Sequence, residues 1–421
     1  MERKNGRIEG ENDMAIIYII SMAVAFSFYF GGAQVVFWYK YLIALLWALS
    51  YLGVCIFKEK KIKGNSAIII KMYVYPLLTI LAWSSFIFIF HSPSGANIGN
   101  VTRMVSNIVY LILAVTSAVS TTYYFGKKVI KYSIWAIFIS IMANLIYCIH
   151  LYGLGIFLQY LPQAASSTDF PFGSVLYNFA SCIEVQDATL ATGFYILYMI
   201  LFDEEDSIKT KLFYMGLLLV CSYLGFKRTE FIAVIFTVIV MWIIKKYAID
   251  LSLMIKVIGI AILLFSFGYI CIVKWDLFQT IIDKVGANVT GRQNVYRNLA
   301  RYYEISPLYI GKGFTFVDKT MYDTTGFSAH NTVVRMYAEL GFIPFIIWIV
   351  WYLIRIPLKI LNKFGEKNAL IVMTSTLYLF FTYCIGNSMN FYCIQYSFIL
   401  ITVATFDSNG KLNYKKIRFK I

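Results

Sequence analysis

Residues 254–273 read MIKVIGIAILLFSFGYICIV and contain one charged side chain, Lys256. An α-helix of about 20 apolar residues is long enough to cross the hydrocarbon core of a bilayer. Similar stretches recur along all 421 residues, of which 60% are hydrophobic and only 14% are charged, with a mean hydropathy of +0.69. This composition excludes a disordered chain and argues against a soluble globular protein. It predicts one integral membrane domain over residues 1–421.

The apolar stretches predict an all-α polytopic membrane protein with about 12 transmembrane helices. The polar first 13 residues resemble a cytoplasmic start and not a cleaved signal peptide, because apolar stretches continue to the end of the sequence. The expected spans are residues 14–30, 35–57, 68–90, 101–125, 132–152, 175–202, 212–226, 230–245, 254–273, 332–353, 369–386 and 389–406.

The positions of Lys and Arg predict the orientation of these helices, because basic residues concentrate in cytoplasmic loops. With both termini in the cytoplasm, the inner segments hold 25 of the 37 basic residues and 12 of the 22 acidic residues. The net charge of +15 therefore mainly reflects membrane orientation and does not indicate nucleic-acid binding. These inner segments are residues 1–13, 58–71, 126–131, 203–211, 245–256, 354–368 and 407–421.

Two predicted outer segments, 153–174 and the large loop 274–331, are longer than hairpins, and long loops of this kind are usually functional. The large loop contains TGRQNVYRNLARYYE, a predicted helix on which Arg297 and Arg301 share a face and Arg292 lies nearby. This pattern fits a solvated helix face. It also fits a phosphate cradle, because a guanidinium group binds phosphate through two parallel hydrogen bonds. On the outer membrane face, that phosphate would belong to a polyprenyl-diphosphate sugar carrier or to a phospholipid headgroup.

The end of the large loop carries a second group of candidate residues. Gly311 and Gly313 in IGKGF permit a tight turn or a close approach of two backbone segments. Polar and charged residues then surround the start of the next predicted span: His330, Asn331, Arg335 and Glu339.

A short predicted outer hairpin, GFKRTEF, contains Lys227 and Arg228. Basic residues are disfavoured in short outer loops, so either a function or snorkelling at the membrane edge explains them. Arg103, at the outer start of the fourth predicted span, is a weaker candidate of the same kind.

Glu184 and Asp187 lie three residues apart within an apolar stretch and would share a helix face. Carboxylates within a spanning segment are costly and therefore indicate function. They fit either a buried ion pair with an arginine, or a general base that orients an acceptor hydroxyl.

The histidines and cysteines predict no metal site, because their spacing suits none. His91 and His150 stand alone at span ends and fit interfacial packing, whereas His330 can act as a base or bind the diphosphate or a sugar. The seven cysteines contain no C-x-x-C pair and are expected to be small packing residues of the membrane domain.

The tract from Gly291 to Phe345 resembles the signature region of the O-antigen ligase and Wzy-type polysaccharide polymerase superfamily. The matching elements are Arg292, Pro307–Leu308, Gly311-Lys312-Gly313, His330–Asn331 and Glu339-Leu340-Gly341. Lys227–Arg228 also resembles the Ser-Arg hairpin of the family. CIEVQDATLA is similar to its Glu-Pro-Asn-x-x-Ala stretch, with Glu184 at the glutamate, although valine replaces the proline.

The resemblance implies an inverting glycosyltransferase of the bacterial cytoplasmic membrane that uses neither a nucleotide sugar nor a metal or other cofactor. Donor and acceptor are both oligosaccharides linked to undecaprenyl diphosphate, joined on the outer face, with membrane lipid around the enzyme and a chain-length regulator as a further candidate partner. We expect His330 and Glu184 to activate or orient the acceptor hydroxyl. The expected diphosphate ligands are Arg228, Arg292, Arg297, Arg301, Arg335 and Lys227, supported by Asn331, Gly311, Gly313, Asp187 and Glu339.

Two other functions remain open. An O-antigen ligase shares the fold and the motifs but transfers a finished glycan to another acceptor. A polysaccharide flippase or other secondary transporter would place charged or helix-breaking residues near the middle of several spans, and would not require a cationic outer loop that ends in His-Asn.

Overall fold

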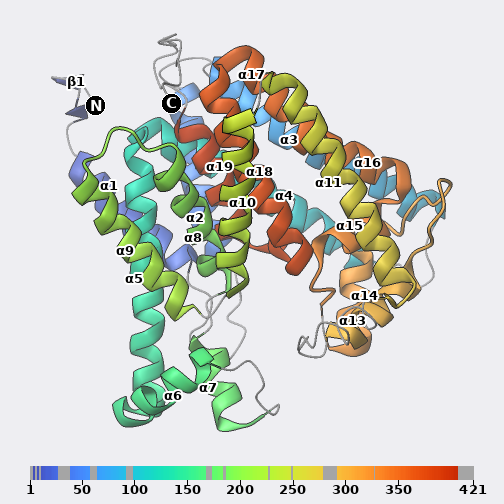
Figure 1. Cartoon of the computed structure of the whole chain (residues 1–421), viewed down its shortest axis with the longest axis horizontal. Helices are drawn as coiled ribbons and strands as arrows, with labels where there is room; N and C mark the ends of the chain where they lie inside the picture. The colour runs from blue at the N-terminus through green and yellow to red at the C-terminus, as the bar shows by residue number, and fades with distance from the viewer. Residues whose placement is uncertain are drawn as a thin grey trace.

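The computed structural model is helical apart from the two-residue strands β1 (Arg3–Lys4) and β2 (Arg7–Ile8), which pair antiparallel (Figure 1). It describes residues 3–4, 7–8, 11–26, 38–56, 64–91, 98–166, 173–183, 186–225, 228–247, 250–277, 292–326 and 328–405. The helices are α1 (Glu11–Phe26), α2 (Trp38–Val54), α3 (Gly64–Phe86), η2 (Ile87–His91), α4 (Ile98–Phe125), α5 (Lys128–Tyr152), α6 (Leu154–Ser166), α7 (Val175–Ile183), α8 (Gln186–Leu201), α9 (Ile208–Leu224), α10 (Arg228–Tyr247), α11 (Leu251–Lys274), α13 (Arg292–Leu299), η3 (Ala300–Tyr302), α14 (Phe316–Thr325), α15 (Thr332–Leu340), α16 (Phe342–Val350), η4 (Trp351–Arg355), α17 (Ile356–Phe364), α18 (Glu366–Ile385), η5 (Ser388–Asn390) and α19 (Tyr392–Ala404).

The structure confirms the predicted helical fold, and several helices are long and apolar enough to cross a membrane, as the composition predicts. Four shorter apolar helices accompany them, at Asp13–Phe26, Tyr39–Val54, Ala188–Leu201 and Tyr392–Ala404. The total of 12 spans stays a prediction. Within the described residues, the six long candidates are Asn65–His91, Gly99–Phe125, Lys128–Tyr152, Leu251–Lys274, Phe342–Phe364 and Glu366–Ile385.

Hydroxyl groups join the helices at the centre of the bundle, where α19 packs against α4 and α8, and α1 packs against α5. The Tyr18 hydroxyl lies 2.6 Å from Ser133 Oγ and 2.9 Å from the Tyr396 hydroxyl. Thr121 Oγ1 lies 2.7 Å from the same Tyr396 hydroxyl. Because an unpaired hydroxyl is costly in apolar surroundings, these contacts hold α1, α4, α5 and α19 together.

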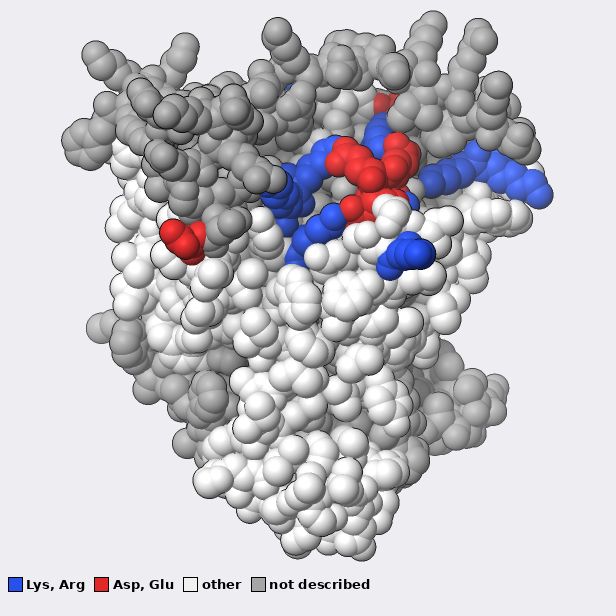
Figure 2. All heavy atoms as spheres, turned by 90° about the vertical axis from the view of Figure 1, so that its left-hand side faces the viewer, with Lys and Arg blue, Asp and Glu red and all other residues white. Residues whose placement is uncertain are grey.

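On one face of the molecule, charged side chains gather near one end. Figure 2 shows them in a band near the top of one face, above a broad uncharged surface. Lys127 at the start of α5 pairs with Glu205, and Lys367 of α18 pairs with Glu204 at 2.7 Å. The predicted inner segments 126–131, 203–211 and 354–368 therefore meet at one end of the bundle, whereas α6, α7, α13 and α14 lie at the other (Figure 1).

Three predicted boundaries were wrong. The expected span 175–202 consists of two helices, α7 and α8. The expected span 332–353 is interrupted at Gly341, which has φ of +83°, so α15 precedes the span that begins at Phe342. The candidate span that begins at Phe342 extends to Phe364 and so takes in most of the expected inner segment 354–368.

Candidate functional site

The turn at residues 309–313 packs directly against the C-terminal end of α15. Gly313 N donates to Glu339 O at 2.8 Å, and Phe342 N donates to Tyr309 O at 2.8 Å. Gly311 and Gly313 have φ of +91° and +89°. A Cβ atom on Gly311 would lie 2.4 Å from Glu339 O, so glycine is required for the predicted close backbone approach.

Helix α3 anchors this turn. Trp83 Nε1 lies 2.8 Å from Leu340 O and 3.2 Å from Ile310 O, so one indole donor faces both backbone segments. Phe314 N donates to Ser84 Oγ at 2.9 Å. The candidate membrane span that contains Trp83 and Ser84 therefore fixes the position of the turn and of α15.

The N-terminus of α15 is fixed by its own cap and by the loop between α18 and α19. Asn331 Oδ1 accepts a hydrogen bond from Val334 N at 3.0 Å, the usual arrangement of an N-cap asparagine. Thr332 N donates to Gly386 O at 3.0 Å. His330 precedes the cap in a left-handed conformation with φ of +47°, which is uncommon outside glycine. The backbone of the His330–Asn331 pair is thus held in a defined geometry.

A charged pair lies on the buried face of α15. Arg335 and Glu339 are one turn apart and have no exposed surface, with Arg335 Nε 3.8 Å from Glu339 Oε2. The Arg335 guanidinium also lies over the Phe314 ring, 5.9 Å from its centroid. Burial is the main cause that raises the pKa of Glu339 to about 7, against the opposing effect of Arg335.

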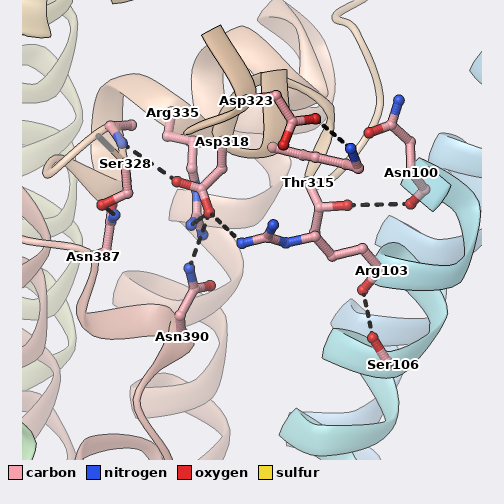
Figure 3. Close-up of polar contacts among 12 residues, drawn as sticks. Asn100, Arg103, Ser106, Thr315, Asp318, Asp323, Ser328, Arg335, Asn387 and Asn390 are labelled. Atoms are coloured by element: carbon pink, nitrogen blue, oxygen red, sulfur yellow. Dashed lines mark hydrogen bonds and ion pairs between the residues drawn. The ribbon is translucent and has the colours of Figure 1, made fainter. Parts of the chain in front are cut away.

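Asp318 of α14 lies at the centre of this cluster (Figure 3). Its Oδ2 atom is 3.6 Å from Arg335 Nη1, 3.6 Å from Arg103 Nη2 and 3.4 Å from Asn390 Nδ2. Its Oδ1 atom accepts a hydrogen bond from Ala329 N at 3.3 Å. One carboxylate therefore connects α4, α14, α15 and η5 with the loop that leads to His330.

The ion pairs of this cluster are long, and several of its polar atoms lack a hydrogen-bond partner. Among the buried side chains that the structure describes, these atoms include all three guanidinium nitrogens of Arg335, Glu339 Oε2 and Asn331 Nδ2. Leaving a buried charged group without hydrogen bonds is costly, and such exceptions call for a functional explanation. Because two arginines and two carboxylates meet here with long ion pairs and unpaired polar atoms, the cluster is a candidate functional site.

The structure brings together only part of the predicted site. Arg335 is fully buried, so it does not present its guanidinium to the surface, and its role as a diphosphate ligand stays a prediction. Arg297 is exposed and pairs with Asp276 at 2.8 Å, and Arg301 is exposed in η3. The residues of the predicted site that meet at the 309–313 turn and α15 are Gly311, Gly313, Asn331, Arg335 and Glu339, with His330 preceding the helix.

Other predicted site residues are not placed by the structure. Glu184 and Lys227 lie outside the described residues. Arg228 begins α10, Arg292 begins α13 and Asp187 lies in α8, but their side chains are outside the described part of the chain.

Another buried carboxylate lies close to the predicted basic hairpin. Glu230, in the first turn of α10, has no exposed surface and accepts hydrogen bonds from Thr192 and, at 3.0 Å, from Ser222. These contacts attach the start of α10, where Arg228 lies, to α8 and α9.

The sequence does not point to Asp318 or Trp83 as site residues, and it makes Arg103 only a weaker candidate. Asp318 shares α14 with Lys319 and Asp323, which pair with each other on the exposed side of the helix. No spacing rule distinguishes these two aspartates, because the partners of Asp318 come from distant parts of the sequence. Neither the protein-family models nor the curated proteins that were compared contain a match to this chain.

Proposed function

We propose that this protein is a polysaccharide polymerase of the bacterial cytoplasmic membrane. It joins oligosaccharide repeat units linked to undecaprenyl diphosphate on the outer face by inverting, metal-independent glycosyl transfer. The growing chain is the donor, a hydroxyl group of the incoming unit is the acceptor, and undecaprenyl diphosphate is released. The end of the bundle that contains α13 and α14 is the outer end, and both chain termini are cytoplasmic.

One observation carries this proposal: separate parts of the tract from Gly291 to Phe345, which resembles the family signature, meet around the buried Arg335. The Gly311–Gly313 turn packs on the end of α15, and Arg335 and Glu339 occupy the buried face of that helix. These residues belong to elements that are many positions apart in the sequence. Their close contact supports a common functional role, because a solvated loop would not need to bring these residues together.

The proposed chemistry follows from where negative charge develops. As the glycosidic bond to the diphosphate breaks, charge builds on the leaving group, and fixed positive groups stabilise it. Arg228 and Arg292 are the leading candidates for direct contact, because a planar guanidinium forms two parallel hydrogen bonds with phosphate. The buried Arg335 stabilises the charge on the leaving group through its electrostatic field, without direct contact. His330 is the first candidate to accept the proton of the acceptor hydroxyl, and Glu184 is the second.

The first test is a gel of surface polysaccharide from a deletion strain and from the complemented strain. Collapse of a ladder to single repeat units, restored by the intact gene, supports the polymerase. Long polymer that stays on its lipid carrier indicates a ligase. An unchanged pattern, with expression of the gene demonstrated, favours a transporter.

His330→Ala tests the assigned base. We expect this variant to reach the membrane at the wild-type level and to produce no polymer, because the acceptor hydroxyl loses its proton acceptor. His91→Ala, which changes an exposed histidine at the end of η2, is the matched control and should retain activity. Wild-type polymer from His330→Ala would refute this role.

A further inference from the structure

Arg103, Asp318 and Arg335 form a row that leads from the protein interior to its surface. The side chain of Arg335 is 0% exposed, that of Asp318 is 2% exposed and that of Arg103 is 39% exposed. Figure 3 shows Asp318 between the two arginines, with Arg103 reaching across from α4. Only Arg103 can therefore meet a ligand from outside without a rearrangement of the cluster.

The depth of Arg103 indicates the kind of ligand. It lies in the first turns of α4, near the start of the candidate membrane span Gly99–Phe125. Basic side chains at the end of a spanning helix lie at the level of lipid headgroups. The diphosphate of a lipid-linked substrate occupies the same level, so Arg103 is at the right depth to contact a lipid phosphate.

Two contacts within the protein hold the Asp318 carboxylate in place. Ala329 N donates to its Oδ1 atom at 3.3 Å, and Asn390 Nδ2 lies 3.4 Å from its Oδ2 atom. The 3.6 Å separation between Asp318 Oδ2 and Arg103 Nη2 is an ion pair without a short hydrogen bond. Among the described residues, Asp318 is the ion-pair partner that orients Arg103, and the long separation leaves guanidinium donors for another anion.

We propose that Arg103 binds the lipid diphosphate of the substrate and that Asp318 is the residue that positions it. This inference rests on the proposed polymerase function and adds a ligand from α4 to the arginines of the large loop. Through Ala329, the same carboxylate links the diphosphate contact to the backbone next to His330. The positions of the leaving group and of the candidate base are thereby coupled.

The test measures binding of undecaprenyl diphosphate to the purified full-length protein in lipid nanodiscs. Arg103→Gln and Asp318→Asn should each weaken binding by about tenfold or more, because the first removes the charged ligand and the second removes the ion pair that orients it. The double variant should bind no more weakly than Arg103→Gln, because Asp318 acts through Arg103. Asp323→Asn is the matched control: it makes the same change on the same helix, in an exposed pair, and should leave binding unchanged.

Additive losses in the double variant, or wild-type binding by Arg103→Gln, would overturn the proposal. Arg103 is partly exposed, so its replacement keeps the test valid even if Asp318→Asn does not fold. The same measurement with phosphatidylglycerol distinguishes the source of the phosphate: an effect on phosphatidylglycerol alone would make Arg103 a headgroup contact and overturn the assignment. Polymer formation by the wild-type protein is measured separately. Absence of polymer would contradict the polymerase function, whereas unchanged binding by the variants would contradict only the role of Arg103.

Discussion

Replacing Gly311 by alanine tests whether the 309–313 turn really packs on the backbone of α15. The new Cβ atom would lie 2.4 Å from Glu339 O and 2.5 Å from Leu340 C, which are backbone atoms with little freedom to move. The positive φ of +91° adds a second penalty for any residue with a side chain.

These penalties can be estimated from general values. A left-handed conformation costs a residue other than glycine about 1–2 kcal/mol. Overpacking costs about 1–3 kcal/mol, and each lost backbone hydrogen bond about 1 kcal/mol. We therefore expect Gly311→Ala to lower the free energy of unfolding by about 3–6 kcal/mol. Gly326→Ala is the control, because Gly326 also has a positive φ, of +73°, but its Cβ atom would meet nothing within 4 Å; we expect a loss of about 1–2 kcal/mol.

The assay compares the midpoints of thermal unfolding of both variants and the wild type in one detergent at one scan rate. Polymer formation is measured in cells alongside, and only Gly311→Ala should reduce it, because the turn supports the helix that carries Arg335. Equal unfolding midpoints for the two variants would refute the close approach of the turn to α15.

Two further predictions concern charged groups of the site. Because Glu339 keeps its proton to about pH 7 in the folded protein and releases it near 4.5 when unfolded, stability should fall as the pH rises through this window, and Glu339→Gln should remove that dependence. Unfolding midpoints of the wild type and the variant at about pH 5 and about pH 8 measure the effect, and an unchanged pH dependence would contradict the buried environment. Arg292→Lys should reduce polymer formation severalfold, because an ammonium group lacks the planar fork of a guanidinium. Arg297→Lys, at an exposed ion pair with Asp276, should have less effect, and equal activity of both variants and the wild type would favour a solvated helix face.

Part of the site could be predicted from local sequence. Gly311 and Gly313 were expected to permit a close backbone approach, and both have positive φ at such a contact. Asn331 was selected by its place beside His330 and proves to be the N-cap of α15. Such features depend on a few neighbouring residues, which is why the sequence reveals them.

The start of the span after α15 could not be predicted in the same way. Residues 332–353 are predominantly apolar, and hydropathy alone does not show where a helix is interrupted. Gly341 ends α15 because the backbone at Tyr309 and Ile310 approaches it, with a Cβ atom on Gly341 lying 2.3 Å from Ile310 C. That constraint comes from Tyr309 and Ile310, which lie 32 and 31 residues earlier in the sequence.

The sequence by itself determined that the chain is a helical protein with long apolar spans. In a bilayer every backbone polar group needs an internal partner, so apolar stretches of sufficient length become helices. Only the tertiary structure decided which charges meet. Asp318 joins Arg103 and Arg335 from two other helices, and Trp83 of α3 reaches the backbone at Ile310 and Leu340. Contacts of this kind depend on which helices pack against one another, and the local pattern of one helix does not name its partners.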